Sequence, residues 1–390
     1  MAGPLSHLKV LDLSRILAGP FSGQILADLG ADVIKVERPG AGDDTRSWGP
    51  PFLDDGAGGK GDAGYYLACN RGKRSVCADL STAQGQELVK ALAARSDIVL
   101  ENYKAGGLAK YGLDYASLKA IRPDIIYCSI TGFGQDGPRA GQSAYDFMIQ
   151  AMGGLMSVTG EADGYPGAGP QKVGVPIVDL MTGMYASIAI LAAVARRNET
   201  GEGEYIDIGM LDVMVGSLCN QAQNYFGSGN VPRRSGNRHP NIQPQDVFPC
   251  KDGYVVIVVG NDGQYVKFCD VIGRPDLSSD PRYRTNGDRV TNLDSLMPQI
   301  EEALAADGMA GWVARLEAAG VPCAPINTVP DILADPQAIH RNMLIHLEHP
   351  NAGKLPMLAS PMRFANAPLE YHRHPPLLGE HDAEVRSELA

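Results

Sequence analysis

The first half of the chain alternates short apolar segments with helical ones, and this alternation limits the fold more than any other feature of the sequence. An apolar segment at residues 10–13 leads into the turn Ala18-Gly19-Pro20, a helical segment at 21–29 and a stop at Gly30. Proline suits the first turn of a helix, and glycine suits the position after its end. Strands are predicted at residues 10–13, 31–36, 76–79, 98–101, 125–130 and 205–208, and helices at 21–29, 83–94, 180–197 and 211–220.

This order of elements predicts how the strands pair. Strands that alternate with helices pair in parallel, so we expect an α/β fold with a doubly wound, Rossmann-like sheet. Ligands of such sheets bind beyond the carboxyl ends of the strands. The chemistry is therefore expected in the loops at residues 14–20, 37–40, 102–107 and 132–140.

The length and a change in composition predict two domains. A chain of 390 residues exceeds one ordinary compact core. Gly, Asn, Pro and Arg become frequent at residues 227–244, and a hairpin is expected at Asp252-Gly253. We predict a large domain that starts with residues 1–200, a linker at 201–226, a small domain at 227–320, and a linker with return to the large domain over 321–390.

Charge and cysteine usage argue against several kinds of partner. The formal net charge is -11 at pH 7, which disfavours binding to nucleic acid or to a membrane surface. The chain start shows no secretory pattern, and the apolar stretch 184–195 is shorter than the roughly 20 residues that span a membrane. The seven cysteines contain no C-x-x-C pair, which favours buried thiols in a reducing compartment. We expect a cytoplasmic protein with no metal site.

Familiar cofactor motifs are absent, but cations gather near predicted strand ends. No G-x-G-x-x-G follows the first strand, so an NAD-dependent dehydrogenase loses its main support. Lys73 and Arg74 lie in the segment 70–75, and Arg38 follows the second strand. Cations in such places can hold phosphates. The spacing of residues 70–75 alone favours a solvated loop.

Three residues have a structural interpretation beside a chemical one. Asp179 stands at the start of the predicted helix 180–197, where an aspartate most often caps the helix but can also act, when ionised, as a nucleophile. Asp146 starts the apolar run 147–156, whose default interpretation is core packing. His239 is expected to be exposed, and a single loop histidine is more often incidental than catalytic.

Taken together, these segments resemble family III CoA transferases, a family that includes formyl-CoA and carnitine CoA-transferases and also the alpha-methylacyl-CoA racemases. Each motif alone is weak, but their order and spacing over nearly the whole chain are specific. The matching segments are LDL at 11–13, AGP at 18–20, GADVIKVERPG at 30–40, NRGKRS at 70–75, ENY at 101–103, TGFG at 131–134, GGLMSVTG at 153–160, DLMTGM at 179–184 and PPLLGEH at 375–381.

The resemblance implies a fold, an assembly and substrates. The family has a large Rossmann-like domain built from both chain ends and a smaller α+β middle domain, and two subunits interlock as a homodimer. The implied substrates are an acyl-CoA thioester and a carboxylic acid. Coenzyme A is then a substrate and product, and no tightly bound cofactor is expected.

The resemblance also implies roles for individual residues. The nucleophile of the family maps onto Asp179, and Tyr145 and Asp146 are further catalytic candidates. The implied CoA-binding residues are Ile16, Leu17, Arg38, Asn102, Tyr103, where the family has Phe, and Lys110, where it has Arg. Lys73 and Arg74 are further candidates for the nucleotide phosphates, and His239 and Asn241 are candidates on a loop that covers the substrate.

Three features bear on which reaction is catalysed. In the racemases of the family a histidine precedes the aspartate, whereas Tyr145 precedes Asp146 here. A tyrosine, with a pKa of about 10, is a poor base at neutral pH, which favours transfer. Leu17 replaces a glutamine of the formyl-CoA transferases, and their run of glycines is missing. Residues 236–245 instead resemble the transferases for succinate and glutarate, which implies a dicarboxylic acceptor.

We therefore expect Asp179 to attack the thioester of a donor such as succinyl-CoA and to form a mixed anhydride, which the CoA thiolate converts into an aspartyl-CoA thioester. The acceptor acid then reverses these steps. Backbone N–H groups at the start of the helix 180–197 are expected to stabilise the oxyanion. Two alternatives stay open: an alpha-methylacyl-CoA racemase or other isomerase, which needs a second base, and a non-catalytic protein that binds CoA esters.

Overall fold

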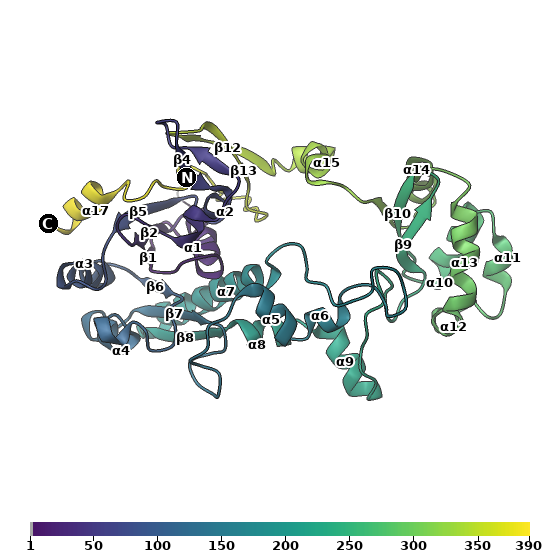
Figure 1. Ribbon diagram of the computed structural model, residues 1–390, viewed down its shortest axis with the longest axis horizontal. Coiled ribbons are helices and arrows are strands. Elements are labelled where there is room, and N and C mark those ends of the chain that lie inside the picture. Colours follow the sequence, from purple (N-terminus) through teal and green to yellow (C-terminus); the bar gives the residue numbers. More distant parts are fainter. Residues whose placement is uncertain (1–2) are drawn as a thin grey trace. The chain divides into compact units, whose positions relative to one another are not determined.

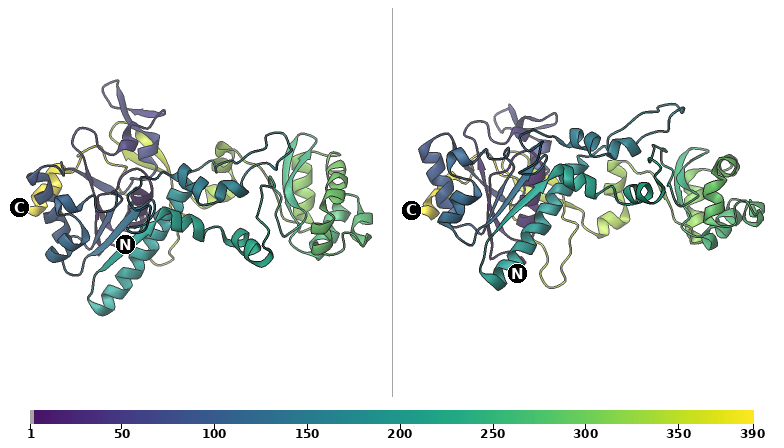
Figure 2. Two further views of the ribbon diagram at one scale, coloured as in Figure 1. Left: turned by 60° about the horizontal axis from the view of Figure 1, so that its bottom comes forward. Right: turned by 90° about the horizontal axis from the view of Figure 1, so that it is seen from below.

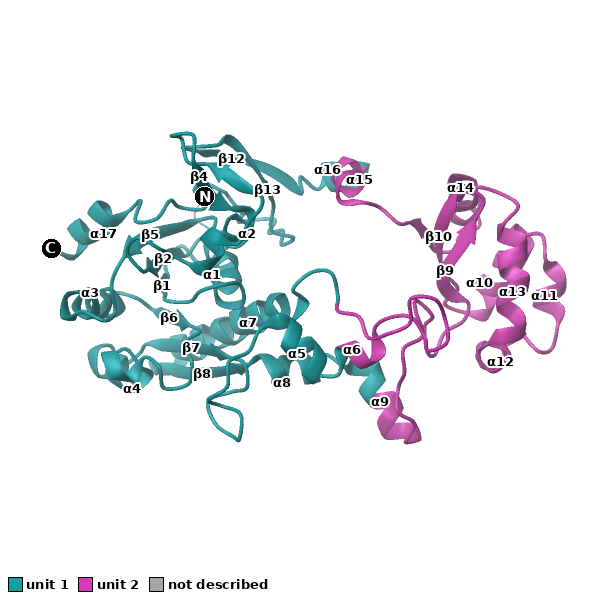
Figure 3. Cartoon of the chain, in the orientation of Figure 1, with its two compact units in different colours: residues 1–155, 173–222, 336–390 teal, residues 156–172, 223–335 magenta. Residues whose placement is uncertain are grey.

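A computed structural model describes residues 3–390 of the chain (Figure 1). The chain divides into two compact units (Figure 3). Unit 1 contains residues up to 155, residues 173–222 and residues 336–390, and unit 2 contains residues 156–172 and 223–335. The large unit is thus built from both ends of the chain, as predicted.

Unit 1 is organised around a six-stranded sheet in which all neighbouring strands are parallel. In spatial order the strands are β5 (Lys73–Cys77), β2 (Asp32–Glu37), β1 (Lys9–Asp12), β6 (Ile98–Glu101), β7 (Ile126–Thr131) and β8 (Glu204–Gly209). The predicted doubly wound α/β fold is confirmed. From β1 the strand order runs outward to β2 and β5 on one side, and from β6 it runs outward to β7 and β8 on the other. Doubly wound sheets bind ligands at such a switch point, here between β1 and β6.

Helices cover both faces of the sheet (Figure 1). One face carries α1 (Ala18–Asp28) and α7 (Ile177–Thr200), and the other carries α3 (Ala83–Ala94), α4 (Tyr115–Ile121) and α17 (Asp382–Leu389). Each face of the sheet has its own hydrophobic core, and alternate strand residues point into one core or the other. Val10 and Val33 pack on the side of α1 and α7, whereas Leu11 and Ile34 pack on the side of α3. Because both faces are covered, most residues of the six strands are buried.

The helix α7 is longer than predicted. It has 24 residues, begins at Ile177 rather than Leu180, and packs along α1 against the sheet (Figure 2). Among residues 3–390 it is the one helix long and apolar enough to cross a membrane by length and composition. The apolar part of this helix is therefore longer than the stretch 184–195 that was identified in the sequence. Half of its most apolar window is buried inside the protein, and core helices pass the same test.

The rest of unit 1 consists of two hairpins and short helices. The segment 201–226, expected to be a linker, instead supplies β8 and α8 to this unit. The remaining elements are the hairpin β3 (Phe52–Asp54) and β4 (Lys60–Ala63), the hairpin β12 (Leu344–His349) and β13 (Gly353–Leu358), the helices α2 (Gly64–Leu67), α5 (Asp146–Met152), α8 (Met210–Gly216) and α16 (Pro336–His340), and the short 3-10 turns η1 (Asp44–Ser47) and η2 (Ala109–Tyr111).

Unit 2 has its own antiparallel sheet and core, which confirms the predicted α+β middle domain. Its sheet has the order β11 (Cys323–Pro325), β10 (Gly253–Val258) and β9 (Gln245–Cys250), and the turn at Asp252-Gly253 joins β9 to β10 as expected. Its helices are α10 (Asp262–Val271), α11 (Pro275–Ser279), α12 (Asn286–Thr291), α13 (Leu293–Leu304), α14 (Met309–Ala318) and α15 (Val329–Ala334). The helices α6 (Leu155–Val158) and α9 (Cys219–Ser228) cross from one unit to the other.

Candidate active site

Asp179 lies in a cavity of about 280 Å³ at the switch point of the sheet. The cavity is lined by the loop after β1, the loop after β6 and the segment after β7, all of which were predicted as functional loops. Its lining includes Ile16, Leu17, Ala18, Asn102, Tyr103, Tyr145 and Asp179. The structure therefore brings together the predicted nucleophile, Tyr145 and four of the predicted CoA-binding residues, Ile16, Leu17, Asn102 and Tyr103.

The carboxylate of Asp179 is buried without a hydrogen-bond partner among residues 3–390. Asp179 lies in the first turn of α7, whereas Pro176 occupies the capping position, so the interpretation of Asp179 as the helix cap is wrong. The residue is 8% exposed. Burial, together with the nearby negative charge of Asp146, raises the pKa of Asp179 to about 7. A strongly perturbed carboxylate in a cavity is typical of a functional residue.

Asp146 caps α7 from a different helix. Its Oδ2 atom accepts the N–H of Val178 at 2.8 Å and the N–H of Asp179 at 3.3 Å. The N–H of Leu180 donates to the carbonyl of Pro176 at 3.1 Å. The first amides of α7 are therefore occupied, and the expectation that they stabilise an oxyanion is wrong.

The loop between β1 and α1 is held by side chains from neighbouring strands. The Lys35 ammonium donates to the carbonyl of Ser14 at 2.7 Å. The Asn102 side chain accepts the N–H of Arg15 at 2.8 Å and donates to its carbonyl at 2.6 Å. Asn102 therefore ties the loop after β6 to the loop after β1 across the switch point, at the predicted CoA-binding position.

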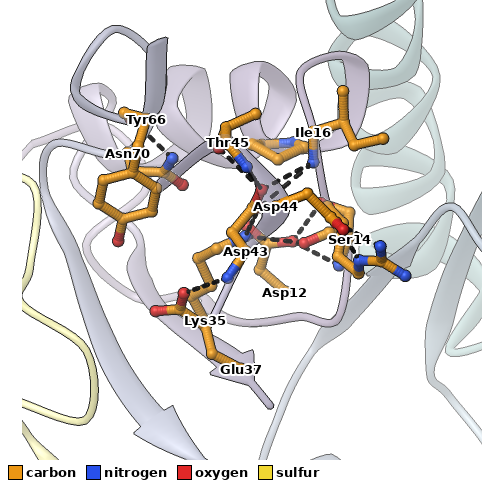
Figure 4. A network of polar contacts seen from close by, with 12 residues as sticks. Asp12, Ser14, Ile16, Lys35, Glu37, Asp43, Asp44, Thr45, Tyr66 and Asn70 are labelled. Atoms are coloured by element: carbon orange, nitrogen blue, oxygen red, sulfur yellow. Dashed lines mark hydrogen bonds and ion pairs between the residues drawn. The ribbon is translucent and has the colours of Figure 1, made fainter. Parts of the chain in front are cut away.

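A buried ion pair fixes the next residue of the same loop (Figure 4). The carboxylate of Asp43 accepts the N–H of Ile16 at 3.2 Å and contacts the fully buried ammonium of Lys35 at 2.9 Å. Burial alone would raise the pKa of Asp43, but Lys35 and the hydrogen bonds from Thr45 lower it to about 2. Ile16 has a φ of 73°, a left-handed conformation that a β-branched residue rarely adopts. Such strain persists only where the surroundings hold it in place.

The start of α1 faces the same cavity with unused amides. In the part of the chain that the structure describes, the N–H groups of Leu17, Ala18 and Gly19 have no acceptor, and Pro20 has no N–H. Leu17 and Ala18 line the cavity with Asp179. The first amides of a helix carry a partial positive charge and bind anionic groups. This helix start, rather than that of α7, offers donors in the cavity of Asp179.

Arg38 lies in a second cavity, of about 830 Å³, beyond the carboxyl ends of β1 and β2. Arg15 and Tyr103 line both cavities, so they stand where the two meet. Arg15 is half-exposed and is paired with Asp44. The sequence analysis missed Arg15, although its place in the first functional loop was a usable signal.

Lys73 is not available to a phosphate. Its side chain is fully buried, and its ammonium donates to Asp12 at 2.9 Å, to the carbonyl of Pro20 at 2.8 Å and to Asn70 at 2.8 Å. An ammonium has three donors, so none remains for a ligand. The prediction that Lys73 binds CoA phosphates is therefore wrong: Lys73 neutralises a buried carboxylate under α1.

Arg74 is also engaged elsewhere. It pairs with Asp32 and with Glu384 and Glu388 of α17, so it fixes the C-terminal helix, and its prediction as a phosphate ligand is wrong. Lys110 is exposed in η2, with its ammonium 4.7 Å from the ring centre of Tyr111. Lys110 lines neither of the two cavities, and its role stays a prediction.

His239 and Asn241 belong to unit 2. The Nδ1 atom of His239 accepts the N–H groups of Asn241 and Ile242, both at 3.1 Å. The ring is partly buried rather than exposed as expected. The Asn241 side chain exchanges hydrogen bonds with that of Asn224. Their role on a loop over the substrate stays a prediction.

The apolar run after Asp146 does not form core in this chain. Within α5 only Ile149 and Gln150 are buried, while Phe147 is 57% exposed and Met152 is 41% exposed. The default interpretation of this run as core packing is therefore wrong for a single chain. Met184, Tyr185 and Ile188 of α7 are exposed as well.

Comparison with known proteins decides what kind of protein carries this site. The family model described as CoA-transferase family III matches residues 5–382. The chain belongs to CoA-transferase family III. Relatives named as CoA-transferases are 40% and 46% identical over nearly its whole length, so this family III member is a CoA transferase. Transfer is thereby favoured over the racemase and the non-catalytic binding protein.

Two curated relatives and one solved structure define the similarity. The "Succinate--glutarate CoA-transferase" of Agrobacterium fabrum is 46% identical over 386 residues, 99% of this chain and 96% of that protein. The human "Succinyl-CoA:glutarate CoA-transferase" is 40% identical over 99% of this chain and 86% of its own. The crystal structure of a CAIB/BAIF family protein from Brucella suis is 50% identical, with a TM-score of 0.89 over 100% of both chains. These matches confirm the family resemblance and the fold of this family III transferase.

Proposed function

We propose that this CoA transferase moves CoA from succinyl-CoA to a dicarboxylic acid through an aspartyl-CoA thioester on Asp179. The observation that carries the proposal is a buried carboxylate without a partner, in one cavity with the free amides of α1. The relatives named above act, by their names, on succinate or succinyl-CoA and glutarate, which supports the substrate class.

The burial of Asp179 suits a nucleophile that becomes neutral during the reaction. The Asp179 carboxylate attacks the donor thioester, a C–O bond forms, and the C–S bond breaks to release CoA thiolate. The thiolate then attacks the Asp179 carbonyl of the anhydride, and the donor acid leaves as a carboxylate. Both covalent states at Asp179 are uncharged. Burial therefore disfavours the free ionised carboxylate more than the intermediates, and it raises the reactivity of the carboxylate.

The acceptor acid completes the cycle by the same bonds in reverse. Its carboxylate attacks the aspartyl-CoA thioester and releases thiolate, and the thiolate then attacks the acceptor side of the new anhydride. Each attack places negative charge on a carbonyl oxygen. The amides of Leu17 and Ala18 are the donors that we assign to this oxygen, because preorganised N–H groups in a closed site stabilise developing charge.

The two cavities suggest how the CoA ester lies. Arg38 is exposed in the larger cavity, where its guanidinium is available to the phosphates of the nucleotide. The thioester end would then reach Asp179 past Arg15 and Tyr103, which line both cavities. The backbone of Tyr103 is fixed, because its N–H donates to Glu101 at 2.7 Å.

We further propose that the chain acts as a homodimer. Phe147 and Met152 of α5, together with Tyr185 and Ile188 of α7, expose apolar side chains in unit 1. Large apolar side chains exposed in this way are typical of surfaces for protein association. Light scattering coupled to size-exclusion chromatography tests this proposal: twice the chain mass of 41.5 kDa supports it, and a single chain mass refutes it.

Mass spectrometry of the protein with succinyl-CoA tests the intermediate. The wild type should gain an adduct of CoA mass that hydroxylamine removes, and Asp179→Ala should gain none. Turnover with glutarate as acceptor should fall by at least about 10⁴-fold in this variant, because it lacks the carboxylate that forms the proposed thioester. A variant that keeps its turnover, or a wild type that exchanges an alpha proton with solvent without any adduct, would refute the proposal.

A further inference from the structure

Gln150 is a fully buried polar residue that the proposed reaction steps do not use. It lies in α5 with 0% exposure, beside the exposed apolar residues of that helix. Both ends of its amide are engaged. Its Nε2 atom donates to Oδ1 of Asp146 at 2.6 Å, and its Oε1 atom accepts the N–H of Val173 at 2.9 Å. A buried amide with both functions satisfied is held in one orientation.

Gln150 determines how the carboxylate of Asp146 is turned. The Oδ1 atom of Asp146 binds Gln150, which leaves Oδ2 for the N–H groups of Val178 and Asp179. The bond from Gln150 to Val173 also ties α5 to the segment just before α7. Gln150 is therefore linked to the start of α7 in two ways. One link runs through Asp146, which accepts the first amides of α7, and the other through Val173, which lies just before the helix.

We propose that Gln150 is a positioning residue for the nucleophile: it holds Asp146 against the first amides of α7 and so fixes Asp179 in the cavity. The proposal rests on the proposed role of Asp179 as the nucleophile. Gln150 lines neither of the two cavities, and it acts through Asp146 and Val173.

The physical reason is geometric. Without Gln150 the Oδ1 atom of Asp146 loses its hydrogen bond, so the carboxylate is held less firmly against the amides of Val178 and Asp179. The first turn of a helix frays when its amides are not capped. A displacement of about 1 Å at a reacting group can cost about 100-fold in rate. Binding of the CoA ester depends on other loops and should change little.

The charges that face Asp179 make the effect visible in a pH profile. Asp146 from α5 and Tyr65 from α2 are the titratable groups that interact with Asp179 among residues 3–390. Replacement of Gln150 by glutamate keeps the shape and an acceptor for Val173, but it sets a second carboxyl against Asp146. The glutamate can replace the donor of Gln150 Nε2 to Asp146 only while its carboxyl group and that of Asp146 share one proton.

Two variants and a control test the proposal. Gln150→Met removes both hydrogen bonds at similar volume, and kcat should fall about 10- to 100-fold while KM for succinyl-CoA stays within about twofold. The ratio of kcat in Gln150→Glu to kcat in the wild type, measured at the same pH, should be highest at low pH and should fall as the pH rises and the shared proton is lost. Gln86→Met on α3, where the amide donates to the carbonyl of Leu80 at 2.9 Å, should behave like the wild type.

The outcomes separate this inference from the proposed function. If Asp179→Asn is inactive while Gln150→Met keeps kcat within twofold of the wild type, only the role of Gln150 is overturned. If Asp179→Asn keeps its turnover, the proposed function fails first. If Gln150→Met does not fold, Gln150→Glu decides: a pH profile like that of the wild type, or a loss of activity that does not depend on pH, overturns the proposal.

Discussion

The helices α1 and α7 both begin at the cavity of Asp179, but they use their first amides in opposite ways. The amides at the start of α7 donate to Asp146, whereas those of Leu17, Ala18 and Gly19 at the start of α1 have no acceptor among the described residues. The two helix starts can therefore have different roles in the site. The occupied helix start carries Asp179, the proposed nucleophile, and the free one can receive negative charge.

The largest loss of kcat among these tests is expected when the amides at the start of α7 are left without an acceptor, as those of α1 are. Asp146→Ala removes the acceptor of the Val178 and Asp179 amides, and these donors then compete with α1 for the charge of Asp179. We expect kcat with succinyl-CoA and glutarate to fall about 100- to 1,000-fold, which corresponds to about 3–4 kcal/mol of barrier. Steady-state kinetics measure this.

Asp146→Asn is the matched control for that variant. Its side-chain oxygen can still accept the two amides, so we expect a loss of only about 10-fold. Equal losses in the two variants would mean that the charge of Asp146, rather than its hydrogen bonds, matters. The contrast between the helix starts would then have no role in positioning.

The distance between the two helix starts offers the next test. A Cβ atom added at Gly183 would lie 2.7 Å from the carbonyl oxygen of Ala18 and 3.1 Å from the ring of Phe21. Gly183 follows Asp179 by one helical turn, so Gly183→Ala should push Asp179, the proposed nucleophile, away from the amides of α1. We expect a loss of about 10- to 100-fold in kcat, with a loss of about 1–3 kcal/mol in stability.

Gly216→Ala provides the comparison for this substitution. Gly216 ends α8, and a Cβ there would meet no atom within 4 Å. Its kcat and its free energy of unfolding should equal those of the wild type within about 0.5 kcal/mol. Wild-type kcat in Gly183→Ala would show that the close approach of α1 and α7 serves packing alone.

Sequence patterns predicted the sheet and singled out Asp179, which lies in the cavity, because these depend on local features and on family motifs. The strand β6 was predicted with its observed bounds, since a strand buried on both faces leaves a continuous apolar run. Asp179 was assigned through the motif at 179–184. The predictions for Lys73 and Arg74 failed, because their partners Asp12 and Glu384 are distant in sequence and no local pattern announces them.

The same limit explains the missing parts of the site. A helix start was assumed to be capped by its own Asp179, but the cap comes from Asp146 on another helix, and only the folded chain brings the two together. Gln150 carries no signal in a sequence, because a buried glutamine inside an apolar run looks like an irregularity. Polar contacts between elements are the features that a single sequence leaves undetermined.

The burial of Asp179 should be visible as a cost in stability that depends on pH. Its folded-state pKa of about 7 lies above the ordinary value of 3.8. The stability that this group contributes is thus present at low pH and is lost as the pH rises through about 7. Asp179→Asn removes this loss. We expect it to be more stable than the wild type by about 2–4 kcal/mol at pH 8, and by almost nothing near pH 4.

Denaturant unfolding at several pH values measures this difference. Asp136→Asn, at an exposed carboxyl of unit 1, should show no such dependence on pH. If Asp179→Asn is no more stable than the wild type at pH 8, the ionised Asp179 carboxylate does not destabilise the folded chain. The contrast between an occupied and a free helix start would then have no energetic consequence for Asp179.

The smallest effect should come from the strained residue before α1. Ile16 is left-handed, with its N–H held by Asp43, and a glycine adopts this conformation without strain. The relief in Ile16→Gly, of order 1 kcal/mol, is offset by the greater freedom of glycine in the unfolded chain, so the free energy of unfolding should change by less than about 1 kcal/mol. The amides of Leu17 and Ala18 lose a stiff neighbour, and we expect kcat to fall about two- to fivefold. Ile16→Val, which keeps the branched side chain, should match the wild type in kcat. A larger loss in Ile16→Val than in Ile16→Gly would mean that the Ile16 side chain contacts the substrate, and that the rigid backbone is not what presents the free amides of α1.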